Sequence, residues 1–219
     1  MQKIIQTIKT SKIIAIVRGV ESSRLIPLAE ALYDGGIRLM EITYSADGSV
    51  SDSETADNIG SLTKHFKGKM YIGAGTVLTE DQVKKTFNDG GQFIISPNID
   101  SEVIKYTKKL GMVSIPGALT PSEAETAKLA GADFVKLFPI TSMGASYVKA
   151  ITAPLSHIPF LAVGGVTPQN VREYLDAGVC GFGIGSNIIN KEYISSGDYG
   201  KITELAREYF RAINGETGE

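Results

Sequence analysis

The fold is decided by a repeating unit whose clearest copy, at residues 160–184, reads FLAVGGVTPQNVREYLDAGVCGFGI. Its two ends, Phe160–Val163 and Gly181–Ile184, are short apolar runs, as expected of strands in a parallel sheet that is covered on both faces. Between them Thr167-Pro168 predicts a helix start, apolar residues follow at helical spacing, and Gly178 is a helix stop. The stretch therefore predicts a strand-helix-strand unit.

The same alternation runs through the whole chain of 219 residues. Six further apolar runs predict strands at Ile13–Val17, Arg38–Thr43, Met70–Ala74, Phe93–Ser96, Val113–Ile115 and Phe134–Phe138. Eight strand-helix units without a linker predict an α/β protein, a single-domain (β/α)₈ TIM barrel over residues 1–219. One extra helix is expected before the first strand, at residues 2–10, and one after the last, at 198–213. A doubly wound open sheet is the alternative, which so many successive units in so short a chain disfavour.

Composition and charge argue against several classes of partner. Hydrophobic residues make up 42% of the chain and charged residues 21%, which is ordinary for a globular protein. The net charge of −2 and the lack of a basic stripe argue against a nucleic-acid partner. The longest apolar run near the N-terminus, Ile13–Val17, is too short for a signal peptide or a membrane span. We therefore expect a cytoplasmic protein with no membrane partner.

Two of the predicted strands contain a charge that a buried strand does not need. The two-residue alternation of a strand puts Lys136 on the face opposite its apolar neighbours, and it does the same for Glu41. If those neighbours pack against the outer helices, both charges point into the barrel. Arg18 and Thr76, at the ends of two other strands, extend the inward set.

Lys136 and Glu41 lie on the sixth and second predicted strands, and alternate strands of a barrel fill the same interior layer. An amine in apolar surroundings loses its preference for the charged form, and its lone pair can attack a ketone to form an imine. A nearby carboxyl group can then move the protons. The alternative is an ion pair that only closes the barrel, since structural pairs also perturb pKa values.

Glycines follow the last two predicted strands, where barrels commonly bind phosphate through backbone N–H groups. The candidates are Gly164 and Gly165 after one strand and Gly185 and Ser186 after the next. A tight turn would explain either glycine site alone. Both together, at these two positions, favour a phosphate site.

Metal and nucleotide cofactors have little support in the sequence. A metal-dependent enzyme needs several converging ligands, but the only histidines are His65 and His157, both expected at the surface. The segment Gly73–Val77 lacks the third glycine of a dinucleotide-binding motif. We therefore expect neither a metal nor a cofactor.

Seven motifs, taken in order, resemble the 2-keto-3-deoxy-6-phosphogluconate (KDPG)/4-hydroxy-2-oxoglutarate (KHG) aldolase family, which includes 2-keto-3-deoxy-6-phosphogalactonate aldolase. They extend from the first strand almost to the end of the chain. They are Ile14-Ala15-Ile16-Val17-Arg18, Glu41-Ile42-Thr43, Gly73-Ala74-Gly75-Thr76-Val77, Ser96-Pro97-Asn98, Ile115-Pro116-Gly117, Val135-Lys136-Leu137-Phe138-Pro139 and Val163-Gly164-Gly165-Val166.

The resemblance implies a metal-independent class I aldolase, a lyase that cleaves a 2-keto-3-deoxy-6-phospho sugar acid to pyruvate and glyceraldehyde 3-phosphate. It implies that Lys136 forms the Schiff base and that Glu41 is the acid/base. The other implied roles are pyruvate carboxylate binding by Arg18 and Thr76, pocket shaping by Pro97, and phosphate binding by Gly164, Gly165, Gly185 and Ser186. It also implies a homotrimer.

Two departures leave the substrate open. Many phosphogluconate enzymes of the family carry an arginine shortly after the Glu-Ile-Thr motif, where this chain has Tyr44 and an extended loop, so carboxylate binding must depend on Arg18. Val163 replaces the threonine usual in that branch and resembles the phosphogalactonate branch. The alternatives are a phosphogalactonate or 4-hydroxy-2-oxoglutarate aldolase, a non-catalytic barrel that binds a phosphorylated ligand, and another phosphate-binding barrel enzyme such as an epimerase or decarboxylase.

Overall fold

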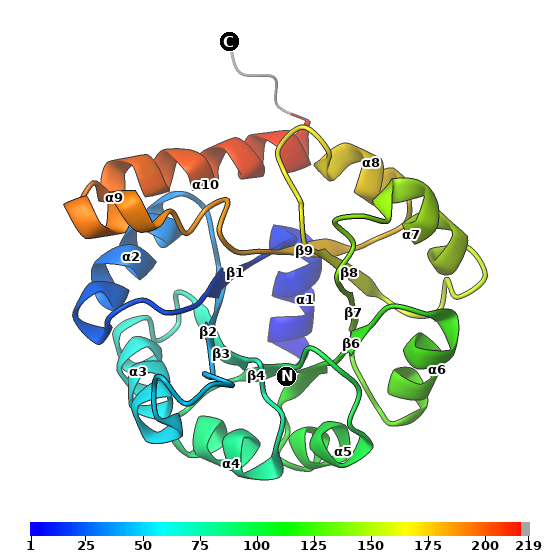
Figure 1. The fold of residues 1–219 in the computed structure, drawn as a ribbon, viewed down its shortest axis with the longest axis horizontal. Helices are drawn as coiled ribbons and strands as arrows, with labels where there is room; N and C mark the ends of the chain where they lie inside the picture. Colours follow the sequence, from blue (N-terminus) through cyan, green and yellow to red (C-terminus); the bar gives the residue numbers. More distant parts are fainter. Residues whose placement is uncertain (216–219) are drawn as a thin grey trace.

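The computed structural model describes residues 1–215 as a parallel β-barrel surrounded by helices (Figure 1). Helices between the strands return the chain to the same end of the barrel. The strands are β1 (Ile13–Val17), β2 (Leu39–Thr43), β3 (Tyr71–Gly75), β4 (Phe93–Ile95), β5 (Val113–Ile115), β6 (Gly117–Ala118), β7 (Val135–Leu137), β8 (Phe160–Val163) and β9 (Gly181–Ile184).

The surrounding helices are α2 (Ser22–Asp34), α3 (Asp52–His65), α4 (Glu80–Asn88), α5 (Ser101–Lys109), α6 (Pro121–Leu129), α7 (Gly144–Thr152) and α8 (Val171–Asp176). Three more helices do not connect two strands. They are α1 (Gln2–Ser11) before β1, and α9 (Lys191–Ser196) and α10 (Tyr199–Asn214) after β9. The first and last confirm the two extra helices expected at the ends of the barrel. None of the helices in the described part of the chain is long and apolar enough to cross a membrane.

The predicted start of α8 at Thr167-Pro168 was wrong. The helix begins at Val171, because Asn170 holds the preceding residues in a turn. Its side-chain oxygen accepts a hydrogen bond from the N–H of Thr167 (2.8 Å), and its amide donates to the carbonyl of Gly165 (2.9 Å). The same residue thus fixes the loop after β8.

The strand order is β5-β4-β3-β2-β1-β9-β8-β7-β6, with every pair parallel. Strands that are consecutive in the chain are neighbours in space, and β1 lies beside β9, so the open doubly wound sheet is excluded. The two ends of this order, β5 and β6, are separated only by Pro116. They are two pieces of one strand, the fifth of the eight expected.

Pro116 explains why that strand is split. Proline has no N–H to donate to a neighbouring strand. Before it, β5 pairs with β4, and after it, β6 pairs with β7. The carbonyl of Pro116 accepts a hydrogen bond from the N–H of Lys136 (2.9 Å), so the chain itself closes the ring at this point.

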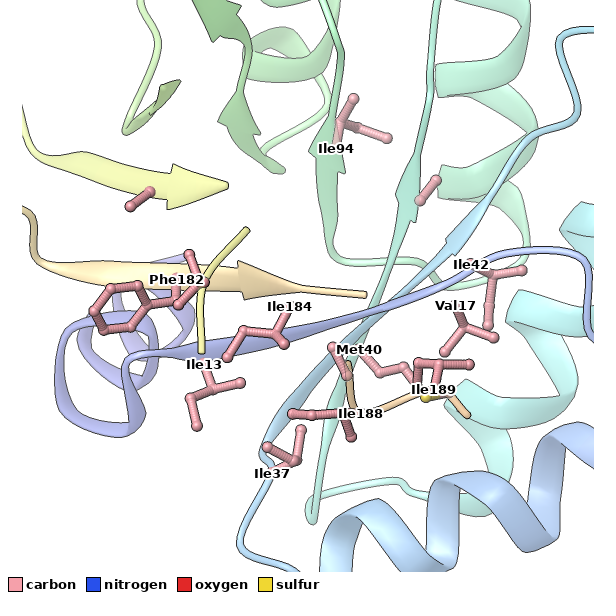
Figure 2. Close-up of a cluster of buried hydrophobic side chains, with 14 of the residues drawn as sticks. Ile13, Val17, Ile37, Met40, Ile42, Ile94, Phe182, Ile184, Ile188 and Ile189 are labelled. Carbon is pink, nitrogen blue, oxygen red and sulfur yellow. The ribbon is translucent and has the colours of Figure 1, made fainter. Parts of the chain in front are cut away.

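The core has two layers. The outer layer, between strands and helices, contains the neighbours of the two charged residues: Val135, Leu137, Met40 and Ile42. Figure 2 shows part of this layer around β1, β2 and β9. The alternation of the strands therefore sends Lys136 and Glu41 into the barrel, as predicted.

The inner layer lies inside the barrel near the first residues of the strands. It contains Phe93, Phe134 and Leu161 together with Ile4 and Ile8 of α1. Seen down the barrel, α1 lies at the centre of the ring (Figure 1). The N-terminal helix therefore closes one end of the barrel and leaves the carboxyl ends of the strands for a site.

Candidate active site

Lys136 occupies the middle of β7 on the inner face of the barrel and is only 8% exposed. Burial lowers the pKa of its amine, Glu41 raises it by attraction, and Arg18 lowers it by repulsion. The ring of Phe138 lies with its centroid 4.5 Å from Nζ. Burial is the largest of the three effects on the pKa, so their balance lowers the pKa and raises the neutral, nucleophilic fraction of the amine.

Glu41 lies on β2, is 1% exposed, and has one carboxyl oxygen, Oε2, without a hydrogen-bond partner in the described structure. Burial raises the pKa of its carboxyl group from 4.5 to about 7, although Lys136 and Arg18 each lower it. Within residues 1–215 none of the salt bridges joins Glu41 to Lys136. The two groups influence each other without forming the closed ion pair of the structural alternative.

A cavity of about 220 Å³ opens above Lys136 at the carboxyl ends of the strands. All seven residues expected to bind substrate line it together with the lysine. Glu41 does not, because it is buried beside the lining. The complete lining is Ile16, Arg18, Thr76, Pro97, Lys136, Phe138, Val163, Gly164, Gly165, Val166, Gly183, Ile184, Gly185, Ser186 and Asn187.

Arg18 and Thr76 meet at the wall of this cavity. The Arg18 guanidinium donates a hydrogen bond to the Thr76 hydroxyl (3.1 Å). Thr76 has a φ of 55°, a left-handed conformation that is costly for a β-branched residue. Such strain tends to persist where the surrounding structure requires it, often at functional sites.

The loop after β2 lies next to Arg18 and borders a second cavity of about 280 Å³. Its first residue, Tyr44, points away from the first cavity. The Tyr44 hydroxyl lies 3.0 Å from the hydroxyl of Thr86 on α4 and donates to the carbonyl of Gln82 (3.2 Å). Arg18 is accordingly the one arginine in the lining of the first cavity, as the structure describes it over residues 1–215.

The glycine loops after β8 and β9 form the opposite wall. Gly164 and Gly165 have φ values of 105° and 69°, so the turn after β8 does require glycine. Within residues 1–215, the N–H groups of Gly164, Gly165 and Ser186 donate no hydrogen bond, and they remain available to an anion.

Three side chains hold the β8 loop in position. Asn187 donates to the carbonyl of Val166 (2.8 Å), and the hydroxyl of Tyr209 on α10 donates to the same carbonyl (2.8 Å). Asn170 holds Gly165 from the other side, as described above. The two glycine loops are therefore tied to each other and to α10.

Several residues of the site were given no role by the sequence analysis. Ile16, Gly183 and Asn187 line the cavity, and Phe138 packs on the amine, but each resembles an ordinary strand or loop residue. The two-residue alternation of β1 would have identified Ile16, which is on the same face as Arg18. The position of the Phe138 ring after the end of β7 has no comparable signal.

The histidines lie at the surface, as expected. His65 is hydrogen-bonded to Glu30 (3.0 Å), and His157 to Glu125 (3.2 Å). Both imidazoles are more than a third exposed.

Comparisons with known proteins identify the family of this chain. The family model for KDPG and KHG aldolase matches residues 4–205. The chain is 39% identical over 177 residues to the 2-dehydro-3-deoxy-6-phosphogalactonate aldolase of Escherichia coli (strain K12), covering 80% of this chain and 83% of that one. It is 30% identical to the 2-dehydro-3-deoxy-phosphogluconate aldolase of Haemophilus influenzae, with 97% of both chains covered.

A solved structure is similar over nearly the same length. It is a KDPG aldolase from Legionella pneumophila in which pyruvate was captured at low pH as a covalent carbinolamine. The identity is 30%, the TM-score is 0.79, and the match covers 93% of this chain and 96% of that one. On the strength of the family match and these relatives, this chain belongs to the KDPG and KHG aldolase family.

Proposed function

We propose that this protein is a class I aldolase that cleaves a 2-keto-3-deoxy-6-phospho sugar acid to pyruvate and glyceraldehyde 3-phosphate. The observation that carries the proposal is a buried lysine amine of lowered pKa beside a cavity that is lined by Gly164, Gly165 and Ser186, whose backbone N–H groups donate no hydrogen bond within residues 1–215. The first feature suits imine formation with a ketone, and the second suits a phosphate.

In the proposed reaction the neutral amine of Lys136 attacks the C2 carbonyl, and loss of water gives an iminium ion. The C3–C4 bond then breaks, its electron pair flows into the iminium to give an enamine, and the C4 hydroxyl loses its proton to become the aldehyde. Protonation of C3 and hydrolysis release pyruvate and regenerate the amine. Glu41 is the group proposed to move these protons, because a pKa of about 7 suits both acceptance and donation near neutral pH.

The other roles follow from charge and position. Arg18 and Thr76 are proposed to bind the carboxylate of the keto acid, since a guanidinium and a hydroxyl are both hydrogen-bond donors. Gly164, Gly165, Gly185 and Ser186 are proposed to bind the phosphate. Pro97 is proposed to shape the wall between these two groups.

The phosphogalactonate epimer is a second candidate substrate. Val163 lines the cavity where the phosphogluconate branch usually has threonine, and a relative of 39% identity is a 2-dehydro-3-deoxy-6-phosphogalactonate aldolase. Pyruvate release from the two epimers, measured side by side with lactate dehydrogenase, decides between them.

We propose further that the enzyme acts in the cytoplasm as a homotrimer, as the family resemblance implies. Analytical ultracentrifugation of the purified protein tests the oligomeric state. A measured mass that differs from that of three chains contradicts the proposed homotrimer.

Borohydride trapping tests the main proposal. Reduction in the presence of pyruvate should attach a three-carbon adduct to Lys136, identified by peptide mass spectrometry. Lys136→Met, which keeps most of the length of the side chain without the amine, should give no adduct and no turnover. An active enzyme without this adduct refutes the proposal, and phosphate-ligand binding without turnover supports a non-catalytic barrel.

A further inference from the structure

The inner face of β3 carries two residues without side chains next to Glu41. In the register of β2 and β3, Gly73 is the partner of Glu41 and Gly75 is the partner of Thr43. Neither glycine has a positive φ, so the backbone at these positions would accept any residue. The reason for glycine must lie in the space that a side chain would occupy.

Each glycine makes room for a different neighbour. A Cβ at Gly73 would lie 2.5 Å from the ring and the carbonyl oxygen of Phe93, which belongs to the inner core. A Cβ at Gly75 would lie 2.6 Å from the carboxyl carbon of Glu41, with Oε1 closer still. The space beside Gly73 is thus filled by Phe93, and the space beside Gly75 is filled by the carboxyl group of Glu41.

An added methyl group at position 75 would have little room of its own. A Cβ at Gly75 would also lie 3.0 Å from the Cγ2 atom of Thr43, so that side is occupied. Glu41 itself is 1% exposed, and its register partner Gly73 borders the Phe93 ring. A methyl group at position 75 would therefore have to displace the Glu41 carboxyl.

We propose that Gly75 is a positioning residue for Glu41: the space left by its missing side chain holds the carboxyl group at its place in the barrel. Its effect on turnover rests on the function proposed above, whereas its effect on packing does not. Lys136 on β7 and Arg18, directly after β1, are the charged groups that influence the pKa of Glu41. Displacing the carboxyl group therefore changes its distances to Lys136 and Arg18, and with them its pKa.

A double-mutant cycle in unfolding tests the packing without reference to activity. Gly75→Ala should lower the denaturant midpoint clearly in the parent, and by much less in a Glu41→Ala background, where the methyl group has room. A folded double variant alongside an unfolded Gly75→Ala single variant supports the proposal equally well. Equal losses in both backgrounds, or failure of both to fold, overturn the proposal.

Kinetics provide the second arm. Gly75→Ala should reduce kcat about 10²-fold, as expected for a misplaced catalytic group. It should also move the pH profile of kcat, and borohydride should still attach pyruvate to Lys136. Gly200→Ala, in helix α10, is the control for a glycine-to-alanine change at an uncrowded position, since Gly200 also has no positive φ and the nearest atom to an added Cβ is 3.8 Å away. An unchanged pH profile in a folded, active Gly75→Ala variant contradicts the assignment.

Discussion

Lys136 and Glu41 stabilise each other's charged forms across the barrel, yet burial outweighs this attraction at both residues. The pKa of the amine is lowered and that of the carboxyl is raised to about 7. Each group is therefore shifted toward its neutral form. A larger neutral fraction of the amine favours attack on a ketone, and a carboxyl group with a raised pKa can donate the proton that imine formation needs.

Glu41 should make the stability of the protein depend on pH. Its pKa is 4.5 as a free group and about 7 in the folded protein, so the unfolded chain ionises first as the pH rises. The contribution of the protonated group is fully present below pH 4.5 and is lost by about pH 7. A difference of this size corresponds to about 3 kcal/mol. Glu41→Gln should therefore gain stability relative to the parent, by up to this amount, between about pH 5 and pH 8. Urea unfolding at both pH values measures the gain, and a pH-independent difference contradicts it.

The same variant should separate chemistry from binding. Glu41→Gln should lower kcat by about 10² to 10⁴, the range for a lost acid/base. The affinity for inorganic phosphate should change little, because Glu41 does not line the cavity. Steady-state kinetics and calorimetric titration measure the two effects. Loss of phosphate affinity in step with kcat would instead indicate a collapsed site.

The β8 loop should tolerate no side chain at Gly165. Gly165→Ala must adopt a φ near 69° and bring its Cβ within 3.0 Å of Thr141. Gly111→Ala has the same left-handed cost at φ 75° in open space, so it controls for backbone strain. We expect Gly111→Ala to lose about 1 to 2 kcal/mol of stability, and Gly165→Ala to lose more because of the contact with Thr141. A tenfold or larger rise in KM for the phosphorylated substrate should follow only from the Gly165 change, and equal KM values in both variants argue against the phosphate role.

Relief of strain at Thr76 should stabilise the protein while weakening substrate binding. Thr76 and Lys12 are non-glycine residues with φ values of 55° and 59°. Replacing either with glycine should raise the unfolding free energy by about 0.5 to 1 kcal/mol, after the entropy cost of glycine is subtracted. Only Thr76→Gly should raise the Kd for pyruvate, since it removes the hydroxyl that meets Arg18. A lower unfolding free energy for Thr76→Gly than for the parent protein, alongside the expected gain in Lys12→Gly, would mean that the hydroxyl is structural.

A half-buried ion pair should hold the closed end of the barrel. The Lys108 amine lies 2.5 Å from Asp133, whose Oδ2 also accepts from the N–H of Ser114 (2.9 Å). Lys108→Ala should cost about 1 to 3 kcal/mol by leaving this carboxylate without its cation. Lys105→Ala removes a lysine from an exposed pair with Glu102 and should cost less than about 0.5 kcal/mol. Thermal unfolding compares the two, and equal costs contradict the prediction.

The alternation of strand residues was enough to predict the barrel and the direction of its inner side chains. It put Lys136 and Glu41 on the inner face because their neighbours needed helices to pack against. It did not reveal the break at Pro116, since a two-residue strand such as β6 has no periodicity to detect. The proline was visible, but its effect depends on which neighbour each half of the strand pairs with.

The details of the site depended on contacts between distant segments. Gly75 resembled a strand end until the register of β2 and β3 put the carboxyl of Glu41 against it. The ring of Phe138 and the carbonyl of Val166 are likewise defined by partners far away in the chain. The local sequence pattern was therefore enough to predict the reactive groups, whereas the residues that hold them in place became visible only in the structure.

The N-terminal helix α1 closes one end of the barrel. Since Ile4 and Ile8 seal the far end, reactants and products share the passage above Lys136. On the proposed mechanism the aldehyde fragment is free once the carbon–carbon bond breaks, while pyruvate remains tethered to the lysine. The order of departure is thereby fixed, with the phosphorylated aldehyde first and pyruvate last.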